Sequence, residues 1–406
     1  MRFLNSKDAW LEKDIFNLAS IVFNIETLVK MGKKIYDVKI PISRETDTGR
    51  DLKKVADLLN ELFIYVLIED IEIEFDIQDM RKNRRNRLPQ FEDCENVCLF
   101  SGGVDSLSGL LNSKKYYNEI YGVYTAHGDL SWGTHIVNNL IKKIKEVEED
   151  INCSTLYAPE MGSRGYSQLR GFLYALFGSV YVSLLNSKNL IIAECGPTMY
   201  QPRFSPYDTI TMTTHPFVMK KAKEIIDILL KRKINLVIPY ENMTKSEVIM
   251  AAPYKEFFKD SHSCISLRFG KNEGTCYGCV IRKLGFLVAD VEDTIYTHDP
   301  IGNRKHDADN LSSLLSFSED ILFNYKNMPD YSKNNIENYN KKDLFKRFAI
   351  DNFAALYEYK NKIGELNPYI EPIYNNALQK LGEEKLIKRI EKVRKKTFKP
   401  NFNKFV

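Results

Sequence analysis

This sequence of 406 residues lacks long apolar runs and lacks a large excess of positive or negative charge. No stretch reaches the roughly 18 apolar residues that a membrane-spanning helix needs, and the first residues lack the apolar core of a secretory signal peptide. Lysine and arginine (58) nearly balance aspartate and glutamate (54), which leaves a net charge of +4. That balance does not suit a protein whose main task is to coat nucleic acid. We therefore expect a cytoplasmic protein that neither enters membranes nor has nucleic acid as its principal partner.

Hydrophobic residues make up 44% of the chain and charged residues 28%, which excludes a largely disordered or collagen-like protein. The length corresponds to roughly two to three domains. Cysteine occurs seven times, an odd number. Because disulfides are rare in a reducing compartment, clustered cysteines in such a protein indicate a metal site or catalysis.

The apolar pattern changes twice along the chain and divides it into three regions. Residues 1–90 combine helical spacing with the alternating strand pattern of Ile71–Ile77, which predicts a small α+β accessory domain. In residues 91–300, five short apolar strands alternate with helices, including the long apolar stretch Gln168–Leu185. This alternation predicts a doubly wound five-stranded parallel sheet, hence an α/β fold class. Residues 301–406 show helical spacing without a clear strand, which predicts a helical C-terminal region.

The most informative motif lies where the first strand of the central region turns into a helix. It reads Ser101-Gly102-Gly103-Val104-Asp105-Ser106. The two glycines let backbone N–H groups approach an anion closely, the two serines add hydroxyl donors, and the helix start directs its positive dipole end to the same place. Asp105 fits beside phosphate when it holds Mg²⁺ directly or through water. We interpret the loop as a site for pyrophosphate and its metal; the alternative is a plain strand–helix turn capped by Asp105 or Ser106.

A group of cysteines forms the second motif. Cys276 and Cys279 have the CxxC spacing by which one turn of chain presents two thiolates to Zn²⁺, and Cys264 lies twelve positions before Cys276. Arg282, which follows the pair, would ease the charge of a thiolate-rich centre. A redox pair or two buried thiols would show the same spacing. Zinc bound by the three cysteines is the interpretation we favour.

Two basic residues are placed to meet phosphate. Lys245 follows the fifth strand near a helix start, where it could neutralise the phosphates held after the first strand. The spacing from Thr244 to Glu247 also fits a capping box, and the two roles are compatible. Arg170 opens the long apolar helix and could stabilise charge on a reacting or leaving phosphate. The alternative is a surface arginine, although a cation at a helix start opposes the dipole.

Two further side chains are candidates for substrate contact. Glu194 ends the fourth strand, and ligands of open α/β sheets lie beyond the carboxyl ends of the strands. Its carboxylate could accept the two N–H donors of a guanine-like ring edge. His215 precedes a helix; it acts on a substrate or is an ordinary loop residue, and the sequence favours neither role.

The segment Ser101–Ser106 resembles the signature of the PP-loop ATP pyrophosphatases. This resemblance implies a five-stranded parallel sheet of the adenine-nucleotide α-hydrolase type, with ATP and Mg²⁺ bound at the loop. In that family a carbonyl or carboxylate oxygen of the substrate attacks the α-phosphate of ATP, pyrophosphate leaves, and a nucleophile then displaces AMP.

Within that group, the cysteines and the following Val280-x-Arg282 resemble the 7-cyano-7-deazaguanine synthase (QueC) family, in which four cysteines hold a structural zinc. Lys245 matches the Thr-Lys-x-Glu segment of that family, and Arg170 resembles the arginine of its Gly-Arg-Asn segment. Three of the four cysteines are present, and Glu273 stands at the remaining position. The implied zinc ligands are Cys264, Cys276 and Cys279, with His262 as the first candidate for the fourth and Glu273 as the second.

The resemblance implies an ATP-dependent carbon–nitrogen ligase that adenylates a 7-deazaguanine carboxylate, such as 7-carboxy-7-deazaguanine, and transfers it to an amine. The product is an amide or, after a second ATP, a nitrile. Residues 1–90 and 301–406 lie outside the usual single-domain enzyme. An extended protein of this kind resembles the branch found in antiphage defence operons, including the Qat and type IV CBASS systems, and the additional domains suggest an amine on a partner protein. Two alternatives stay open. One is a PP-loop enzyme that modifies tRNA, which the basic stretches 81–87 and 385–404 favour. The other is a catalytically silent nucleotide-binding scaffold of a defence complex.

Overall fold

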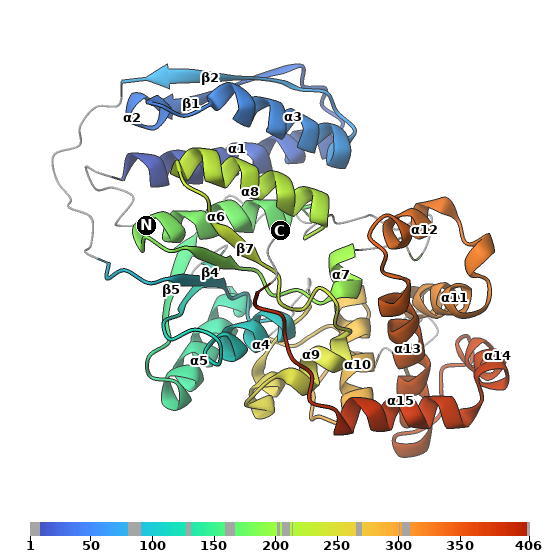
Figure 1. The fold of residues 1–406 in the computed structure, drawn as a ribbon. Helices are drawn as coiled ribbons and strands as arrows, with labels where there is room; N and C mark the ends of the chain where they lie inside the picture. The colour runs from blue at the N-terminus through green and yellow to red at the C-terminus, as the bar shows by residue number, and fades with distance from the viewer. Residues whose placement is uncertain are drawn as a thin grey trace.

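The computed structural model describes residues 9–79, 91–126, 131–158, 167–200, 204, 212, 214–264, 270–299, 301–302 and 309–403 (Figure 1). A central parallel sheet carries helices on both faces, and regions from the two ends of the chain pack around it. Within the described ranges, no helix combines the length and the apolar character needed to cross a membrane.

The central sheet confirms the predicted doubly wound fold. All of its strands are parallel and lie in the order β5-β4-β3-β6-β7. They are β3 (Asn96–Leu99), β4 (Tyr121–Ala126), β5 (Asn152–Tyr157), β6 (Asn189–Ile191) and β7 (Asn235–Val237). The chain moves outward from β3 through β4 to β5 and then returns to the other side of β3. Ligands of such sheets bind where the winding reverses, here between β3 and β6, beyond the carboxyl ends of the strands.

Two helical layers cover the sheet (Figure 1). On one face lie α6 (Arg170–Leu184) and α8 (Pro216–Leu230), and on the other lie α4 (Val104–Ser113) and α5 (Trp132–Val147). Helix α6 is buried along most of its length because it lies between the sheet and the first helix of the chain. This position explains why its sequence is apolar on nearly every side. A short helix, α7 (Gly196–Tyr200), follows the fourth strand of the sheet.

The N-terminal unit places a two-stranded parallel sheet over α6 and α8 (Figure 1). Its elements are α1 (Trp10–Lys30), β1 (Asp37–Ser43), α2 (Arg44–Asp47), α3 (Leu52–Leu67) and β2 (Glu72–Gln78). Helix α1 packs on α6, and α3 packs on α8. Glu26 of α1 is almost fully buried and accepts a hydrogen bond from Ser167 Oγ at 2.6 Å. The unit is therefore joined to the central layer by polar as well as apolar contacts.

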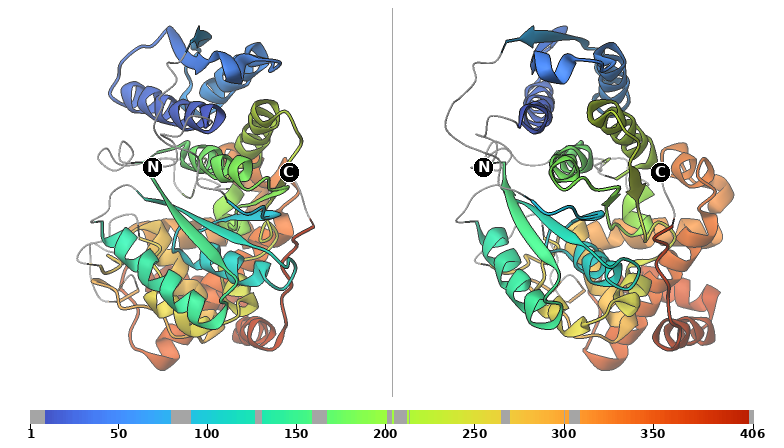
Figure 2. Two further views of the ribbon diagram at one scale, coloured as in Figure 1. Left: turned by 90° about the vertical axis from the view of Figure 1, so that its left-hand side faces the viewer. Right: turned by 60° about the vertical axis from the view of Figure 1, so that its left-hand side comes forward.

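The C-terminal region is helical, as the sequence predicts. It packs on α9 (Lys245–Ala251) and α10 (Tyr277–Ala289) of the central region. Its helices are α11 (Asp309–Phe323), α12 (Asp330–Glu337), α13 (Lys342–Lys362), α14 (Glu371–Leu381) and α15 (Glu383–Lys395). Two further views show these orange-to-red helices and the blue N-terminal unit on different sides of the central layer (Figure 2).

The segment after α15 returns to the central region. Phe402 is buried and its ring lies 4.6 Å from that of Tyr116 and 5.8 Å from that of Tyr117, centroid to centroid. One apolar cluster runs through all three regions and includes Phe63 of α3, Phe177 of α6 and Phe345 of α13. The three regions therefore share a continuous core.

Candidate functional site

The glycine-rich loop connects the end of β3 to the start of α4. Gly102 has a φ of +78°, and a Cβ there would lie 2.6 Å from Val137 Cγ2, so both conformation and space favour glycine. Ser106 Oγ accepts a hydrogen bond from the Ser101 N–H at 3.1 Å and donates to the Gly103 carbonyl at 3.1 Å. These hydrogen bonds of the serines stabilise the conformation of the loop. The N-terminus of α4 faces the space above the loop.

Asp105 and Lys245 form a buried ion pair beneath this loop. The Lys245 Nζ lies 2.5 Å from Asp105 Oδ2, and the N–H of Cys195 donates to the same oxygen at 3.1 Å. Burial acts to lower the pKa of Lys245, but the charges of Asp105, Cys195 and Glu194 and the hydrogen bond to Asp105 together outweigh it and raise that pKa. The other carboxylate oxygen, Asp105 Oδ1, is buried and has no hydrogen-bond partner among the described residues. The structure thus brings two predicted site residues together, although they are 140 positions apart.

Glu194 lies beside this pair, three residues after the end of β6. Carboxylate oxygens of Glu194 and Asp105 and the sulfur of Cys195 lie within 4.8 Å of one another. Burial, and then the charge of Asp105, raise the pKa of Glu194 from 4.5 to about 8. At neutral pH most of this carboxyl group therefore carries its proton, so it can donate one hydrogen bond and accept another.

A cavity of about 650 Å³ opens above these residues, at the carboxyl ends of the strands. Its volume is that of a small-molecule site. Predicted site residues on its wall are Ser101, Gly103, Ser106, Arg170, Glu194, His262 and Cys264. Thr214 also lines it, and the Thr214 hydroxyl is buried without a hydrogen-bond partner among the described residues. Buried polar atoms without partners are costly, so this cavity suits a polar ligand that supplies them.

His215 occupies a different environment. It is fully buried before α8, and its ring centroid lies 5.8 Å from that of Tyr65 and 5.3 Å from that of Tyr339. Burial lowers the pKa of His215 to about 4. It does not line the cavity described above, so the structure places this predicted substrate contact in aromatic packing beside the N-terminal unit.

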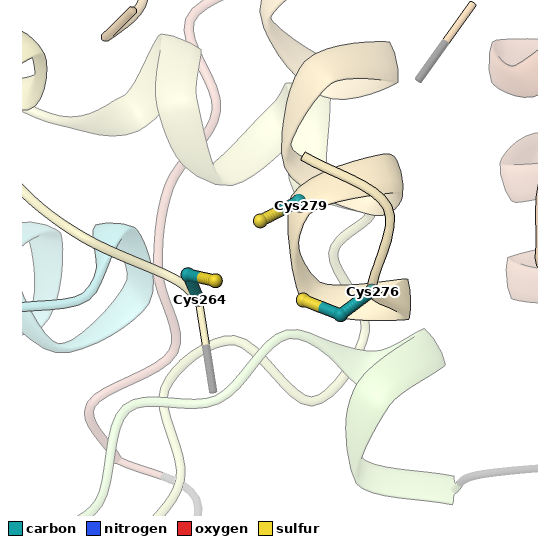
Figure 3. A group of neighbouring side chains, drawn as sticks. All are labelled: Cys264, Cys276 and Cys279. Carbon is teal, nitrogen blue, oxygen red and sulfur yellow. The ribbon is translucent and has the colours of Figure 1, made fainter. Parts of the chain in front are cut away.

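The three cysteines of the second motif converge (Figure 3). Their sulfurs lie within 4.8 Å of one another and point toward a common centre. Cys276 caps α10, Cys279 lies in its first turn, and Cys264 comes from an irregular segment that crosses beside them. Zn–S bonds of about 2.3 Å in tetrahedral geometry put sulfurs roughly 3.8 Å apart, which this arrangement can meet. The donor set could therefore hold a metal ion, and it fits zinc with one further ligand.

Neither candidate for that further ligand belongs to the group of converging atoms in the described part of the chain. The Glu273 carboxylate accepts hydrogen bonds from the Thr275 hydroxyl at 2.6 Å and the Thr275 N–H at 3.3 Å. The ring of His262 lies instead against Gly102 of the phosphate loop. Burial, and then the charge of Arg282, lower the pKa of His262 to about 4.

Arg282 is fully buried and holds neighbouring segments together through hydrogen bonds. Its Nε lies 2.7 Å from Asp293 Oδ1, its Nη1 donates to Ser261 Oγ at 2.9 Å, and its Nη2 donates to the Phe258 carbonyl at 2.8 Å. It thereby fixes the segment that follows the 3-10 helix Lys255–Asp260 and leads into Cys264. No local pattern indicates these contacts, because the partners of Arg282 lie 11 to 24 positions away.

A buried network from the C-terminal helices holds the start of α9, which carries Lys245. The predicted capping box between Thr244 and Glu247 is present. Arg389 of α15 lies 2.9 Å from Glu247 Oε1 and 2.6 Å from Asp351 Oδ1. The hydroxyls of Thr244 and Ser246 each donate to Asp351 Oδ2 at 2.6 Å. The sequence predicts the capping box but not these ion pairs, because no local pattern pairs Arg389 with acids 142 and 38 positions away.

No protein-family model matches the chain. The chain is similar to a 7-cyano-7-deazaguanine synthase of Buchnera aphidicola subsp. Schizaphis graminum (strain Sg), with 22% identity over 215 residues. The match covers 89% of that relative but 47% of this chain. It supports a distant relationship to PP-loop ATP-dependent synthases, in agreement with the loop Ser101–Ser106. More than half of this chain lies outside the similarity.

Proposed function

We propose that this protein is an ATP-dependent ligase that activates a 7-deazaguanine carboxylate as its acyl-adenylate and joins it to an amine. The cavity at the carboxyl ends of the strands carries this proposal, because the phosphate loop, Arg170 and Glu194 all border it. The similarity to a 7-cyano-7-deazaguanine synthase supports the same chemistry.

In the proposed reaction, a carboxylate oxygen of the substrate attacks the α-phosphorus of ATP, and the bond from that phosphorus to pyrophosphate breaks. The backbone N–H groups of Ser101–Ser106 and the start of α4 would hold the pyrophosphate. Arg170, on the cavity wall, would offset the charge that builds on the α-phosphate. An amine then attacks the acyl carbon, and AMP leaves with the former carboxylate oxygen.

Asp105 and Lys245 support this site from below. The buried Asp105 Oδ1, which lacks a partner in the described part of the chain, fits a ligand of Mg²⁺, directly or through water. Bound Mg²⁺ would neutralise charge on the phosphates. Lys245 fixes the other oxygen of Asp105 and adds a positive charge beneath the loop.

Two further assignments complete the proposal. Glu194 would bind the polar ring edge of the deazapurine by accepting from a ring N–H, while its proton is held in the side-chain hydrogen bond with Asp105. Cys264, Cys276 and Cys279 would bind a structural zinc, which would stiffen the segment leading into the cavity.

The amine acceptor is the least constrained part of the proposal. Free ammonia would give the amide, and a second ATP could dehydrate this to the nitrile. The match with the relative covers 47% of this chain, so the chain has regions beyond the matched length. They support a larger acceptor, such as a chain terminus of a partner protein, as in the antiphage defence proteins that the sequence resembles. The reaction would then stop at an amide-linked conjugate.

The basic stretch 385–404 favours an RNA substrate when the sequence is considered alone. In the structure, some of its arginines bind other parts of the protein, which weakens that support. Arg389 is bound internally, and Arg394 donates to the Leu287 and Val288 carbonyls and pairs with Glu358 at 2.7 Å. Part of the positive charge of the tail therefore serves internal packing.

The experiment that tests the proposal measures AMP and pyrophosphate after incubation with Mg²⁺, ATP and 7-carboxy-7-deazaguanine, with and without ammonia. We expect release that requires the carboxylate substrate and is lost in Asp105→Asn. A matched control is Asp150→Asn, which removes the exposed partner of Lys114 at 3.2 Å and should keep activity. Release that requires tRNA instead would favour the RNA-modifying alternative, and nucleotide binding without release would favour the scaffold.

A further inference from the structure

The side chain of His262 lies over the phosphate loop. Its backbone N–H donates to the Gly102 carbonyl at 3.0 Å. A Cβ on Gly102 would lie 3.3 Å from both Cδ2 and Nε2 of the His262 ring, so ring and loop are in close contact. His262 also lines the cavity, together with Ser101 and Gly103. This places an imidazole at the surface where phosphate oxygens would lie.

Both ring nitrogens of His262 are buried, and neither makes a hydrogen bond of normal length and angle with a described residue, although an interaction with the Ser101 backbone partly opposes the lowering of the ring's pKa. An imidazole always carries at least one N–H donor, and leaving a buried donor unpaired is unfavourable. A phosphate oxygen in the loop would satisfy that donor. The Thr214 hydroxyl, also unpartnered and on the same cavity wall, points to the same kind of ligand.

Residues around the cysteine cluster hold the backbone that follows His262. Asn272 Oδ1 accepts hydrogen bonds from the N–H groups of Ser263, at 3.0 Å, and Cys264, at 3.1 Å. A Cβ on Gly278, inside the CxxC turn, would lie 2.5 Å from the Ser263 carbonyl, so this turn packs directly on the segment. The two residues that follow His262 are therefore held by the segment around the cysteines, while its ring faces the loop.

We propose that His262 is a phosphate-contacting residue, whose ring N–H donates to an oxygen of the pyrophosphate moiety, and that the cysteine cluster holds it in that position. The proposal rests on the proposed function, because it assumes that the loop binds pyrophosphate. It gives the cluster a role in phosphate binding and removes His262 from the zinc ligands that the sequence suggests.

The test titrates magnesium pyrophosphate into the full-length protein by calorimetry and measures zinc content by mass spectrometry. A hydrogen bond to a charged group is worth enough that His262→Leu should weaken binding about 10- to 100-fold. His262→Gln keeps an N–H donor and should recover part of the loss. The control His135→Leu alters an exposed histidine on α5 and should bind like the unchanged protein. Zinc content should be equal in all four proteins.

A double-variant cycle tests the link to the cluster. Cys276→Ser should lower zinc content and weaken pyrophosphate binding by releasing His262. Adding His262→Leu should then cause little further loss, because both changes remove the same contact. Additive losses would overturn this link.

Three other outcomes would overturn the inference. Binding of pyrophosphate by His262→Leu within twofold of the unchanged protein would exclude the contact. Loss of zinc in both His262 variants would make His262 a cluster ligand. Absence of magnesium pyrophosphate binding by the unchanged protein would overturn the inference and the proposed function together, whereas the first two results leave the proposed function intact.

Discussion

Replacing Arg389 with methionine tests how strongly the C-terminal helices hold the active-site helix α9. The change removes a buried guanidinium that bridges Asp351 and Glu247. Removing one member of a buried ion pair costs about 3–5 kcal/mol. Here Glu247 keeps its ion pair with Arg347, and Asp351 keeps two hydroxyl donors. We therefore expect a loss near the lower end, about 3 kcal/mol in the free energy of unfolding.

The assay is urea unfolding followed by circular dichroism, applied to Arg389→Met, Asp351→Asn and the double variant. Because the two residues share hydrogen bonds, their effects should be coupled by about 1 kcal/mol or more. The control is Lys388→Met, one position away on α15. Lys388 pairs with Glu384 on the surface, where the two side chains are 73% and 81% exposed. Loss of this pair should therefore change the free energy of unfolding by less than about 0.5 kcal/mol.

A second readout separates general stability from the position of Lys245. Arg389→Met should also lower AMP release under conditions where the variant is fully folded, because α9 carries Lys245. Additive losses in the cycle, or an effect of Arg389→Met no larger than that of Lys388→Met, would refute the reasoning.

Further predictions concern the site itself. Lys245→Met leaves the Asp105 charge buried and unpaired, so AMP release should fall about 100-fold or more in the ligase assay. Cys279→Ser should lower zinc content measured by mass spectrometry, whereas Cys153→Ser, at a half-buried cysteine outside the cluster, should not. The pKa of Glu194 is about 8 in the folded protein and 4.5 in its ordinary state. Between these two pH values, the folded protein therefore holds a proton on Glu194 that the unfolded chain has released. Stability without added Mg²⁺ should therefore fall as pH rises through that window, and urea unfolding at pH 5 and pH 8 should show no such contribution in Glu194→Gln.

The sheet and the phosphate loop could be predicted because they depend on residues that are neighbours along the chain. The alternation in Ile71–Ile77 marks β2 (Glu72–Gln78), and the apolar stretch Gln168–Leu185 marks α6 (Arg170–Leu184). The loop Ser101–Ser106 is equally local. The parallel pairing of β2 with β1 has no such signature, since it depends on how the chain between them folds back.

The contacts around α9 could not be predicted for the same reason. Asp105 and Lys245 are 140 positions apart, and Arg389 and Glu247 are 142 apart. A charge pattern does not tell which of 58 basic residues will meet which of 54 acids. These pairs follow from the order of strands and the packing of helices.

The position of the His262 ring against the phosphate loop could not be predicted for a different reason. Closeness to Cys264 in sequence suggests a shared metal, but the segment is irregular and has no side-chain period. Contacts with Asn272 and Arg282 set its course instead.

The central claim is that a carboxylate oxygen of the substrate attacks the α-phosphate of ATP. The most direct measurement uses 7-carboxy-7-deazaguanine labelled with ¹⁸O in its carboxylate and analyses the products by mass spectrometry. Attack at the α-phosphorus predicts AMP that carries one ¹⁸O atom, together with unlabelled pyrophosphate. Unlabelled AMP, or ADP with labelled phosphate, would contradict the account.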